Sequence, residues 1–224
     1  TVTASNAIGT SSSSAKLAVN SGLPGPFMSR DVGKVGLPGY SEFNGQAFTM
    51  EGEGHDIGGI DDSFHFAYAP MTGDGTITAR IIRPMSSQWA KPGVMMRENL
   101  DSDSRHASVL LIPHWSGALV SRSKKGGETT IHKARHLGEK HVIKKNRLST
   151  PYWLRLIRFR NSFTGYMSAD GYNWRDLGSV EIPMAQNFYV GLPACSQLDK
   201  VTTTMTYDHV SIPTWRTPPP QSQR

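Results

Sequence analysis

The sequence predicts an all-β fold, a two-sheet antiparallel sandwich of the jelly-roll type. Short runs in which apolar and other residues alternate with period two recur along most of the chain, as in strands with two different faces. The 22 Gly and 14 Pro are spread between these runs and supply turns. Helical apolar periodicity is absent, apart from a weak turn near 132–141. About a dozen closely spaced strands favour a two-sheet sandwich.

Residues 152–174, YWLRLIRFRNSFTGYMSADGYNW, show this pattern most clearly. Leu154 and Leu156 alternate with their neighbours, as expected of a strand with one buried face. The segment 160–162 is a short polar connection, and the Asp-Gly pair at 170–171 favours a tight hairpin turn, because Gly adopts positive φ at little cost. The stretch therefore predicts strand, turn, strand, turn, strand.

The second of these turns, SADGYNW, resembles a shortened Asp-box, the turn motif of sialidases and other β-proteins. We expect Asp170 to accept hydrogen bonds from turn amides, Gly171 to take the strained φ and Trp174 to cover the turn. The motif indicates a structural turn rather than a ligand contact.

Other strands are expected along the rest of the main body, separated by Gly- and Pro-containing turns. Residues 77, 79, 94, 154 and 156 are predicted to lie between the sheets. The expected strands are Gln46–Met50, Phe64–Ala69, Thr76–Arg83, Gly93–Glu98, His106–Ile112, Ala118–Ser123, Trp153–Arg160, Phe163–Ser168, Trp174–Val180, Phe188–Leu192 and Thr204–Ile212.

Composition is that of a globular chain. Apolar residues make up 37% of 224, with five Trp, which is enough for a hydrophobic core. No apolar run approaches the roughly 18 residues of a membrane span. Cys195 is the only cysteine, so an intrachain disulfide is excluded.

The N-terminal segment differs from the main body. TVTASNAIGTSSSSAKLAV resembles the last two strands of an immunoglobulin-like domain, with strands at 2–6 and 15–19, and the chain looks cut from a longer one. We therefore expect an immunoglobulin-like hairpin at 1–20, a linker at 21–26, the sandwich at 27–213 and a Pro-rich tail at 214–224. Neighbouring immunoglobulin-like domains of the same polypeptide are the expected protein partners.

A family resemblance covers the main body. The segments GDGTITARI, WAKPGVMMREN, SRHASVLL, PYWLRLIRFRNSFTGYMSADGYNW and TYDHVSI occur in this order. Together they resemble the concanavalin A-like lectin/glucanase superfamily, and more narrowly the bacterial domain family labelled "regulation of enolase protein 1"-like. The resemblance implies the sandwich fold and a lectin-like role, with no settled activity for the narrower family.

The same resemblance implies a structural calcium ion. TYDHVSI is similar to the last strand of many superfamily members, in which an Asp helps to hold Ca²⁺, and Asp208 is the matching position. Asp31 is a second candidate ligand, because N- and C-terminal strands usually pair in this fold. Oxygen ligands suit Ca²⁺, which needs six to eight of them.

The carboxylates favour a binding module over an enzyme. Glycanases of this superfamily carry clustered acids of the type E-x-D-x-x-E, since retaining hydrolysis needs two carboxyl groups about 5 Å apart. Glu51, Glu53 and Asp56 come nearest but do not reproduce the motif. We expect a non-catalytic, carbohydrate-binding or adhesion module of a secreted or surface multidomain protein. The alternatives are a polysaccharide hydrolase or lyase on the same fold and a purely structural module.

Positive charge is concentrated in one segment. Residues 124–147 contain eight Lys or Arg and two Glu, a net charge of +6 that equals that of the whole chain. Such a segment could bind a polyanion, for example an acidic glycan. Alternatively, it is a solvated loop whose like charges keep it from aggregating. Motifs that read nucleic acid are absent, which disfavours a nucleic-acid partner.

The predicted ligand face combines arginines with aromatic rings. Arg97 and Arg122 alternate with apolar residues and should project from the outer side of the sheet, where each could hold a carboxylate or sulfate. We expect an acidic glycan to lie across Arg97, Arg122 and Trp115. The alternative is that both arginines pair with nearby acids and that the Trp rings cap the core. The available aromatic residues are Tyr68, Trp89 and Trp115, and the nearby acids are Glu98, Asp101 and Asp103.

Overall fold

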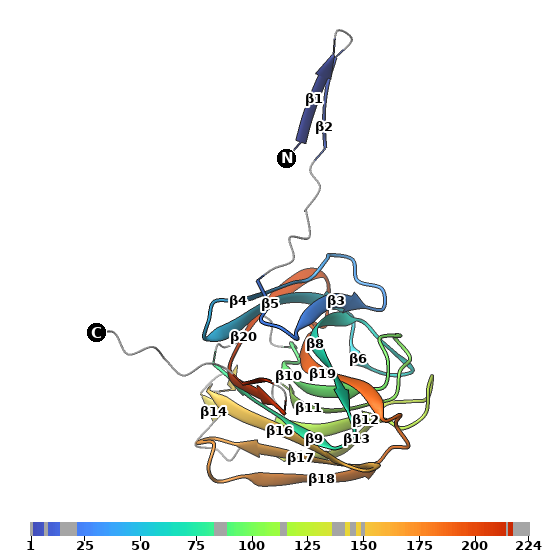
Figure 1. Cartoon of the computed structure of the whole chain (residues 1–224), viewed down its shortest axis with the longest axis vertical. Helices are drawn as coiled ribbons and strands as arrows, with labels where there is room; N and C mark the ends of the chain where they lie inside the picture. Colours follow the sequence, from blue (N-terminus) through green and yellow to red (C-terminus); the bar gives the residue numbers. More distant parts are fainter. Residues whose placement is uncertain are drawn as a thin grey trace, which may run out of the picture.

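The structure is a computed structural model of the chain, shown in Figure 1. It describes residues 2–6, 9–13, 22–82, 89–112, 116–135, 142–143, 147–148, 151–213 and 215–216, and the side chains of these except at 2–6, 9–13, 116, 133–135, 142–143, 147–148 and 215–216. Every regular element within these ranges is a strand. No helix long and apolar enough to cross a membrane is found in them.

One large antiparallel sheet has seven strands. Most of its strands coincide with the predicted ones within a few residues, because their inward and outward positions alternate in the sequence. The sheet adds two strands that were not predicted, β3 and β13; β13 occupies part of the region where a weak helical turn was considered. Its spatial order is β13 (Thr130–Arg135), β12 (Ser116–Arg122), β11 (His106–Ile112), β10 (Gly93–Arg97), β19 (Asn187–Ala194), β8 (Phe64–Thr72) and β3 (Met28–Val32).

The second large antiparallel sheet has eight strands. The stretch examined first, 152–174, supplies two neighbouring strands of this sheet and the turn that leads to a third, as predicted. The spatial order is β18 (Arg175–Glu181), β17 (Ser162–Ser168), β16 (Tyr152–Phe159), β9 (Gly75–Ile81), β20 (Leu198–Ile212), β5 (Ala47–Gly54) and β4 (Tyr40–Phe43), and β21 (Trp215–Arg216) pairs with β20.

The two sheets enclose one apolar core, so the fold is a β-sandwich. Burying this apolar surface is the main stabilising contribution. The five residues predicted to lie between the sheets are all fully buried, which confirms the assignment of their faces: Ile77, Ala79, Val94, Leu154 and Leu156.

Three small two-stranded sheets accompany the sandwich. The N-terminal pair is β1 (Val2–Asn6) with β2 (Gly9–Ser13), an antiparallel hairpin whose second strand lies earlier in the chain than the predicted one. The predicted strand at 15–19 lies outside the described residues. The other two pairs are β6 (Ile57–Gly58) with β7 (Asp61–Asp62) and β14 (Val142–Ile143) with β15 (Arg147–Leu148).

The outer faces of the two sheets differ. The outer face of the seven-stranded sheet carries a second buried apolar cluster, which includes Phe66, Met95 and Leu110 and reaches Ile57 of β6. On the outer face of the eight-stranded sheet, by contrast, residues of the central strands β9, β16 and β20 are half-buried. One side of the sandwich is therefore covered by its own loops, and the other is open.

Candidate functional site

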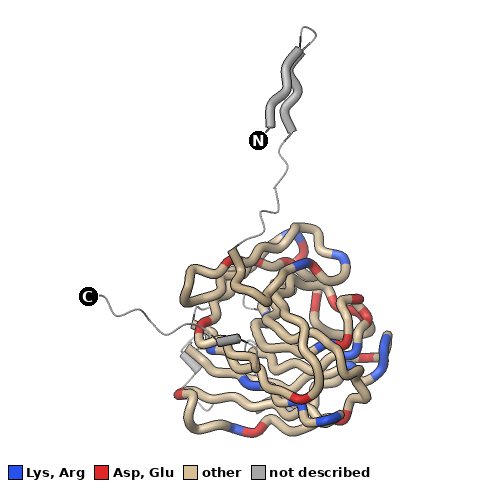
Figure 2. The backbone as a smooth tube through the Cα atoms, in the orientation of Figure 1, with Lys and Arg blue, Asp and Glu red and all other residues tan. Residues whose placement is uncertain are grey.

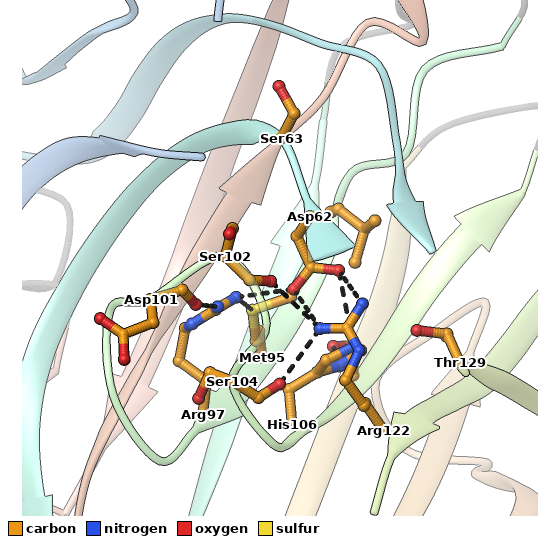
Figure 3. A network of polar contacts seen from close by, with 12 residues as sticks. Asp62, Ser63, Met95, Arg97, Asp101, Ser102, Ser104, His106, Arg122 and Thr129 are labelled. Carbon is orange, nitrogen blue, oxygen red and sulfur yellow. Dashed lines mark hydrogen bonds and ion pairs between the residues drawn. The ribbon is translucent and has the colours of Figure 1, made fainter. Parts of the chain in front are cut away.

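A buried ionic cluster lies on the covered side of the sandwich (Figure 3). Arg97, His106 and Arg122 are cross-strand neighbours on β10, β11 and β12. Asp62 of β7 lies over them, with Oδ1 and Oδ2 accepting from Arg122 at 2.7 and 2.9 Å and Oδ2 accepting from Arg97 at 3.2 Å. All four side chains are fully buried. Two guanidinium groups thus share one carboxylate in the interior.

The same guanidinium groups hold the loops that form the cover. Arg122 donates to the carbonyl oxygens of Gly59, Ser104 and Gly127 at 3.1, 3.1 and 2.9 Å. Arg97 donates to the carbonyl oxygen of Asn99 at 2.8 Å and to that of Asp101. Three separate loops are therefore tied to two side chains, which satisfies their buried carbonyl groups.

Burial and charge set the protonation of this cluster. Burial lowers the pKa of His106 to about 4, despite the attraction of Asp62, so the imidazole is neutral at pH 7. Burial alone would raise the pKa of Asp62, but His106 and the two guanidinium groups more than offset this and lower it. Nε2 of His106 has no hydrogen-bond partner among the described atoms and lies 3.9 Å from Asp62.

These contacts correct the predicted ligand face. Arg97 and Arg122 do project from the outer side of the sheet, but both are fully buried and paired with Asp62, so neither is free to meet a glycan. Tyr68 is buried in the same outer cluster and stacks on Phe66 at 5.5 Å. The period-two alternation correctly predicted the face from which the two arginines project, but it could not reveal the loops that cover this face.

The two tryptophans do not complete that platform. Trp89 is 45% exposed in the turn before β10. Trp115 lies outside the described residues. The four predicted ligand-binding residues that the structure describes, Arg97, Arg122, Tyr68 and Trp89, are not brought together on one exposed surface.

The basic segment 124–147 is described only in part. Lys125 pairs with Asp101 at 2.8 Å and with Asp103 at 3.6 Å, so part of its charge is balanced by the loop beside it. Figure 2 shows acidic and basic positions interspersed along the described backbone. His132 of β13 shares a hydrogen bond with Ser121 at 2.6 Å, and burial lowers its pKa.

The predicted calcium ligands lie in different sheets. Asp208 on β20 accepts hydrogen bonds from Nε and Nη2 of Arg80, at 2.7 and 2.5 Å. The guanidinium group therefore occupies the position in which a metal cation would bind to this carboxylate. Asp31 on β3 accepts from Gly39 and His65. The expected pairing of the first and last sandwich strands is not found, because β3 pairs with β8. The residues described contain no group of three or more potential metal ligands, and these two do not fit a calcium site.

Asp31 instead belongs to a Ser-His-Asp row at the edge of the sandwich. Nδ1 of His65 lies 2.7 Å from Asp31, and Nε2 lies 2.9 Å from Oγ of Ser41. Since an ionised carboxylate can only accept, Nδ1 donates to Asp31, and in the neutral imidazole Nε2 then accepts from the serine hydroxyl. This is the order of contacts in serine hydrolases. Ser41 is only 1% exposed, however, so its hydroxyl links strands β4 and β8 and is closed to a substrate.

We expect the folded protein not to react with a fluorophosphonate probe at Ser41, because the nucleophile is buried. Ser41→Ala should instead lower the free energy of unfolding by about 1–2 kcal/mol, since it leaves Nε2 of His65 buried without a partner. Mass spectrometry of the probe-treated protein and urea denaturation of the variant test these two expectations. Labelling of Ser41 in the folded protein would contradict the structural role.

The turn at 168–174 forms as predicted, with one difference. Asp170 accepts a hydrogen bond from the side-chain amide of Asn173 at 2.7 Å and others from the backbone amides of Asn173 and Tyr172 at 2.7 and 2.8 Å, and these contacts hold its pKa well below the usual value. Gly171 has φ of 80°. The ring beside Gly171 is Trp153, not Trp174. Trp174 is thereby free to contact another residue of the open face.

On the open side of the sandwich, that residue is Arg155 of β16. The carbon at the centre of its guanidinium lies 3.8 Å from the ring centroid of Trp174, a close cation–π contact. Its Nε donates to Oγ1 of Thr78 on the neighbouring strand β9 at 3.0 Å. Arg155 is thus held by an aromatic ring and by an adjacent strand.

A shallow depression of about 400 Å³ lies beside Arg155. Its hydroxyl groups come from the central strands, its accessible apolar atoms come from Ile157 and Pro213, and its volume falls within the range of about 300–1,000 Å³ of small-molecule sites. The residues that line it are Gly75, Thr76, Thr78, Arg155, Ile157, Ser211, Ile212 and Pro213.

This depression was not predicted, although the sequence contains a signal for it. In TITAR, Thr76 and Thr78 alternate with apolar residues, and in the opening stretch Arg155 alternates with the two buried leucines. Period two places such residues on the outer face of a sheet. What it does not reveal is which outer face stays open.

Comparisons with solved structures agree on the fold. The chain is similar to a functionally unknown protein from Saccharomyces cerevisiae, with 17% identity, a TM-score of 0.59 and coverage of 82% of this chain and 95% of that one. It is also similar to the carbohydrate-binding module CBM66 from Bacillus subtilis, with 14% identity, a TM-score of 0.53 and coverage of 82% and 94%. No protein-family model and no curated protein sequence matches the chain. The fold is thus a jelly-roll sandwich of the concanavalin A-like kind.

Proposed function

We propose that this chain is a carbohydrate-binding module whose ligand lies in the depression on the open face of the eight-stranded sheet. The observation that carries the proposal is the lining of that depression, in which hydroxyl groups, apolar atoms and one arginine converge on a single concave site. Convergence of a few polar groups in a concave, partly apolar site is typical of small-ligand recognition.

The lining matches the two requirements of a sugar. The hydroxyl groups of Thr76 and Ser211 have no hydrogen-bond partner within the described residues, so they can donate to and accept from sugar hydroxyl groups. Ile157 and Pro213, which are not part of the buried core, offer the apolar surface that a sugar ring covers with its C–H face. Such a site would hold one or two sugar units of a longer glycan.

The same lining favours binding over hydrolysis. None of the described residues that line the depression is Asp or Glu, whereas glycoside hydrolysis generally needs a pair of carboxyl groups flanking the scissile bond. The likeness to a carbohydrate-binding module supports the proposal at the level of fold. A module of this kind would act at or outside the cell surface, where polysaccharides are met.

The test is glycan binding with a variant that fills the site. The purified protein is first screened on a glycan array, and the best oligosaccharide is then measured by isothermal titration calorimetry. Thr76→Tyr should weaken binding at least about tenfold, because its ring would occupy the space of a sugar unit. Thr204→Tyr is the matched control, since Thr204 is also half-buried on the open face but does not line the depression.

Three other outcomes would contradict the proposal. Equal affinity in wild type and Thr76→Tyr would place the ligand elsewhere on the molecule. Release of reducing ends from the bound oligosaccharide would favour a hydrolase. Absence of any glycan bound on the array would leave the purely structural role of the sandwich as the better explanation.

A further inference from the structure

Arg155 differs from several other arginines of the sandwich, Arg80, Arg105 and Arg122, in what it contacts. Arg80 is paired with Asp208, Arg105 with Glu98, and Arg122 with Asp62, each through a short N···O contact. Arg155, in contrast, uses only Nε in a hydrogen bond, to Thr78. Its two terminal nitrogens make no hydrogen bond or ion pair with any described residue. The N–H groups with which an arginine normally binds a carboxylate are therefore available to a ligand.

The guanidinium of Arg155 is also fixed in place. Trp174 lies against it, and the bond from Nε to Thr78 sets its rotation. A guanidinium held in this way loses little further conformational freedom when a ligand binds, and its remaining fork of two N–H donors fits a planar anion. The fold itself thus already orders this side chain, so its binding to a ligand loses little further conformational entropy.

No acidic residue among the described residues that line the depression neutralises the charge of Arg155. This arginine is the only charged residue among those that line the depression. The nearest acid in strand register is Asp176, which is opposite Tyr166 on the far side of β17 and is exposed. Partial burial lowers the pKa of Arg155, which reflects a charge that has lost some of its water. A negatively charged ligand group would compensate this loss.

We propose that Arg155 makes the depression selective for an anionic sugar, with its two terminal nitrogens donating to the carboxylate of a uronic acid or to a sulfate ester. This deepens the proposed carbohydrate-binding function and rests on it. The sugar ring would lie against Ile157 and Pro213, and the anion would meet the guanidinium at the edge of the site. The acidic-glycan preference expected from the sequence is thereby assigned to a different face and a different arginine.

The experiment compares pairs of ligands that differ only in charge. Tetragalacturonic acid is paired with its full methyl ester, and a sulfated isomalto-oligosaccharide with the unsulfated one, so the two arms distinguish carboxylate from sulfate. Affinities are measured by calorimetry for wild type, Arg155→Gln, Arg155→Lys and Arg175→Gln. Arg175 is an exposed arginine of β18 outside the depression, so its replacement removes the same charge without touching the site.

Wild type should bind the charged member of at least one pair about ten- to a hundred-fold more tightly than the neutral one, the range expected for a charge-assisted, two-pronged contact. Arg155→Gln should remove this preference by lowering the affinity for the charged member, and Arg175→Gln should keep both the preference and that affinity. Arg155→Lys should lose most of the preference, since an ammonium cannot make the fork or the stack. Circular dichroism melting curves confirm that each variant is folded.

Two results would overturn the inference in different ways. If wild type binds neutral and charged members equally and Arg155→Gln changes nothing, the anion preference is wrong while carbohydrate binding stands. If wild type binds no member of either pair and no other glycan, carbohydrate binding itself is wrong. A preference that Arg175→Gln weakens as much as Arg155→Gln would show general charge attraction in place of a built anion site.

Discussion

Asp62→Asn is expected to lower the free energy of unfolding by about 3–5 kcal/mol, the loss typical when one partner of a buried ion pair is removed. The substitution keeps the size of the side chain and removes its charge. Arg97 and Arg122 would then remain fully buried with no carboxylate between them. Urea denaturation at pH 7, followed by circular dichroism, measures the change.

The matched control is the exposed ion pair of Lys125 with Asp101 in the same cover of loops. Both side chains are more than half exposed, and such pairs contribute little because water and salt screen them. Lys125→Ala should therefore leave the urea midpoint nearly unchanged. If Asp62→Asn shifted the midpoint no more than Lys125→Ala does, the buried cluster would not be the anchor of the cover.

Only part of the buried cluster could be predicted from the sequence. Period-two alternation predicted the central strands and the side to which Arg97 and Arg122 point, since a strand has only two faces. Their partner Asp62 lies 35 and 60 residues away from them in the chain, in the two-residue strand β7, which is too short to show a pattern of its own. Long-range loop contacts leave no periodic signal, so the covering of that face was not predictable.

The open face shows the complementary limit. Arg155 and Trp174 both lie in the stretch that first identified the fold, and the pattern there was correctly interpreted as scaffold. Their mutual contact depends on the turn at 170–173, which lets Trp153 rather than Trp174 pack beside Gly171. The residues of a turn can be predicted from the sequence, but which aromatic ring packs on the turn depends on tertiary packing.

His106 should make the stability of this protein depend on pH in mildly acidic solution. Its pKa is about 4 in the folded protein and about 6.5 when unfolded. Between these values the unfolded chain binds a proton that the folded chain does not, so the free energy of unfolding decreases as the pH falls. The full loss, from above pH 6.5 to below pH 4, amounts to about 3 kcal/mol.

The pH range over which stability is lost distinguishes the contribution of His106 from that of Asp62. The pKa of Asp62 is lowered by folding, so its contribution is present above the unfolded pKa of about 3.9 and is lost only as the pH falls further, through the lower folded value. Arg97 and Arg122 flank His106 as its cross-strand neighbours, and a guanidinium group is not deprotonated in proteins. The interval between pH 6.5 and pH 4 therefore reports mainly on the imidazole within this cluster.

His106→Gln isolates that contribution, because glutamine does not titrate. The free energy of unfolding is measured by urea denaturation from pH 7.5 to pH 4 for both proteins, and the variant is subtracted from wild type so that all other acids cancel. We expect the difference between wild type and variant to fall by about 3 kcal/mol across the range, in the direction of a relatively less stable wild type at low pH. A difference that stays constant with pH would mean that the imidazole gains a proton as easily in the folded protein as in the unfolded chain.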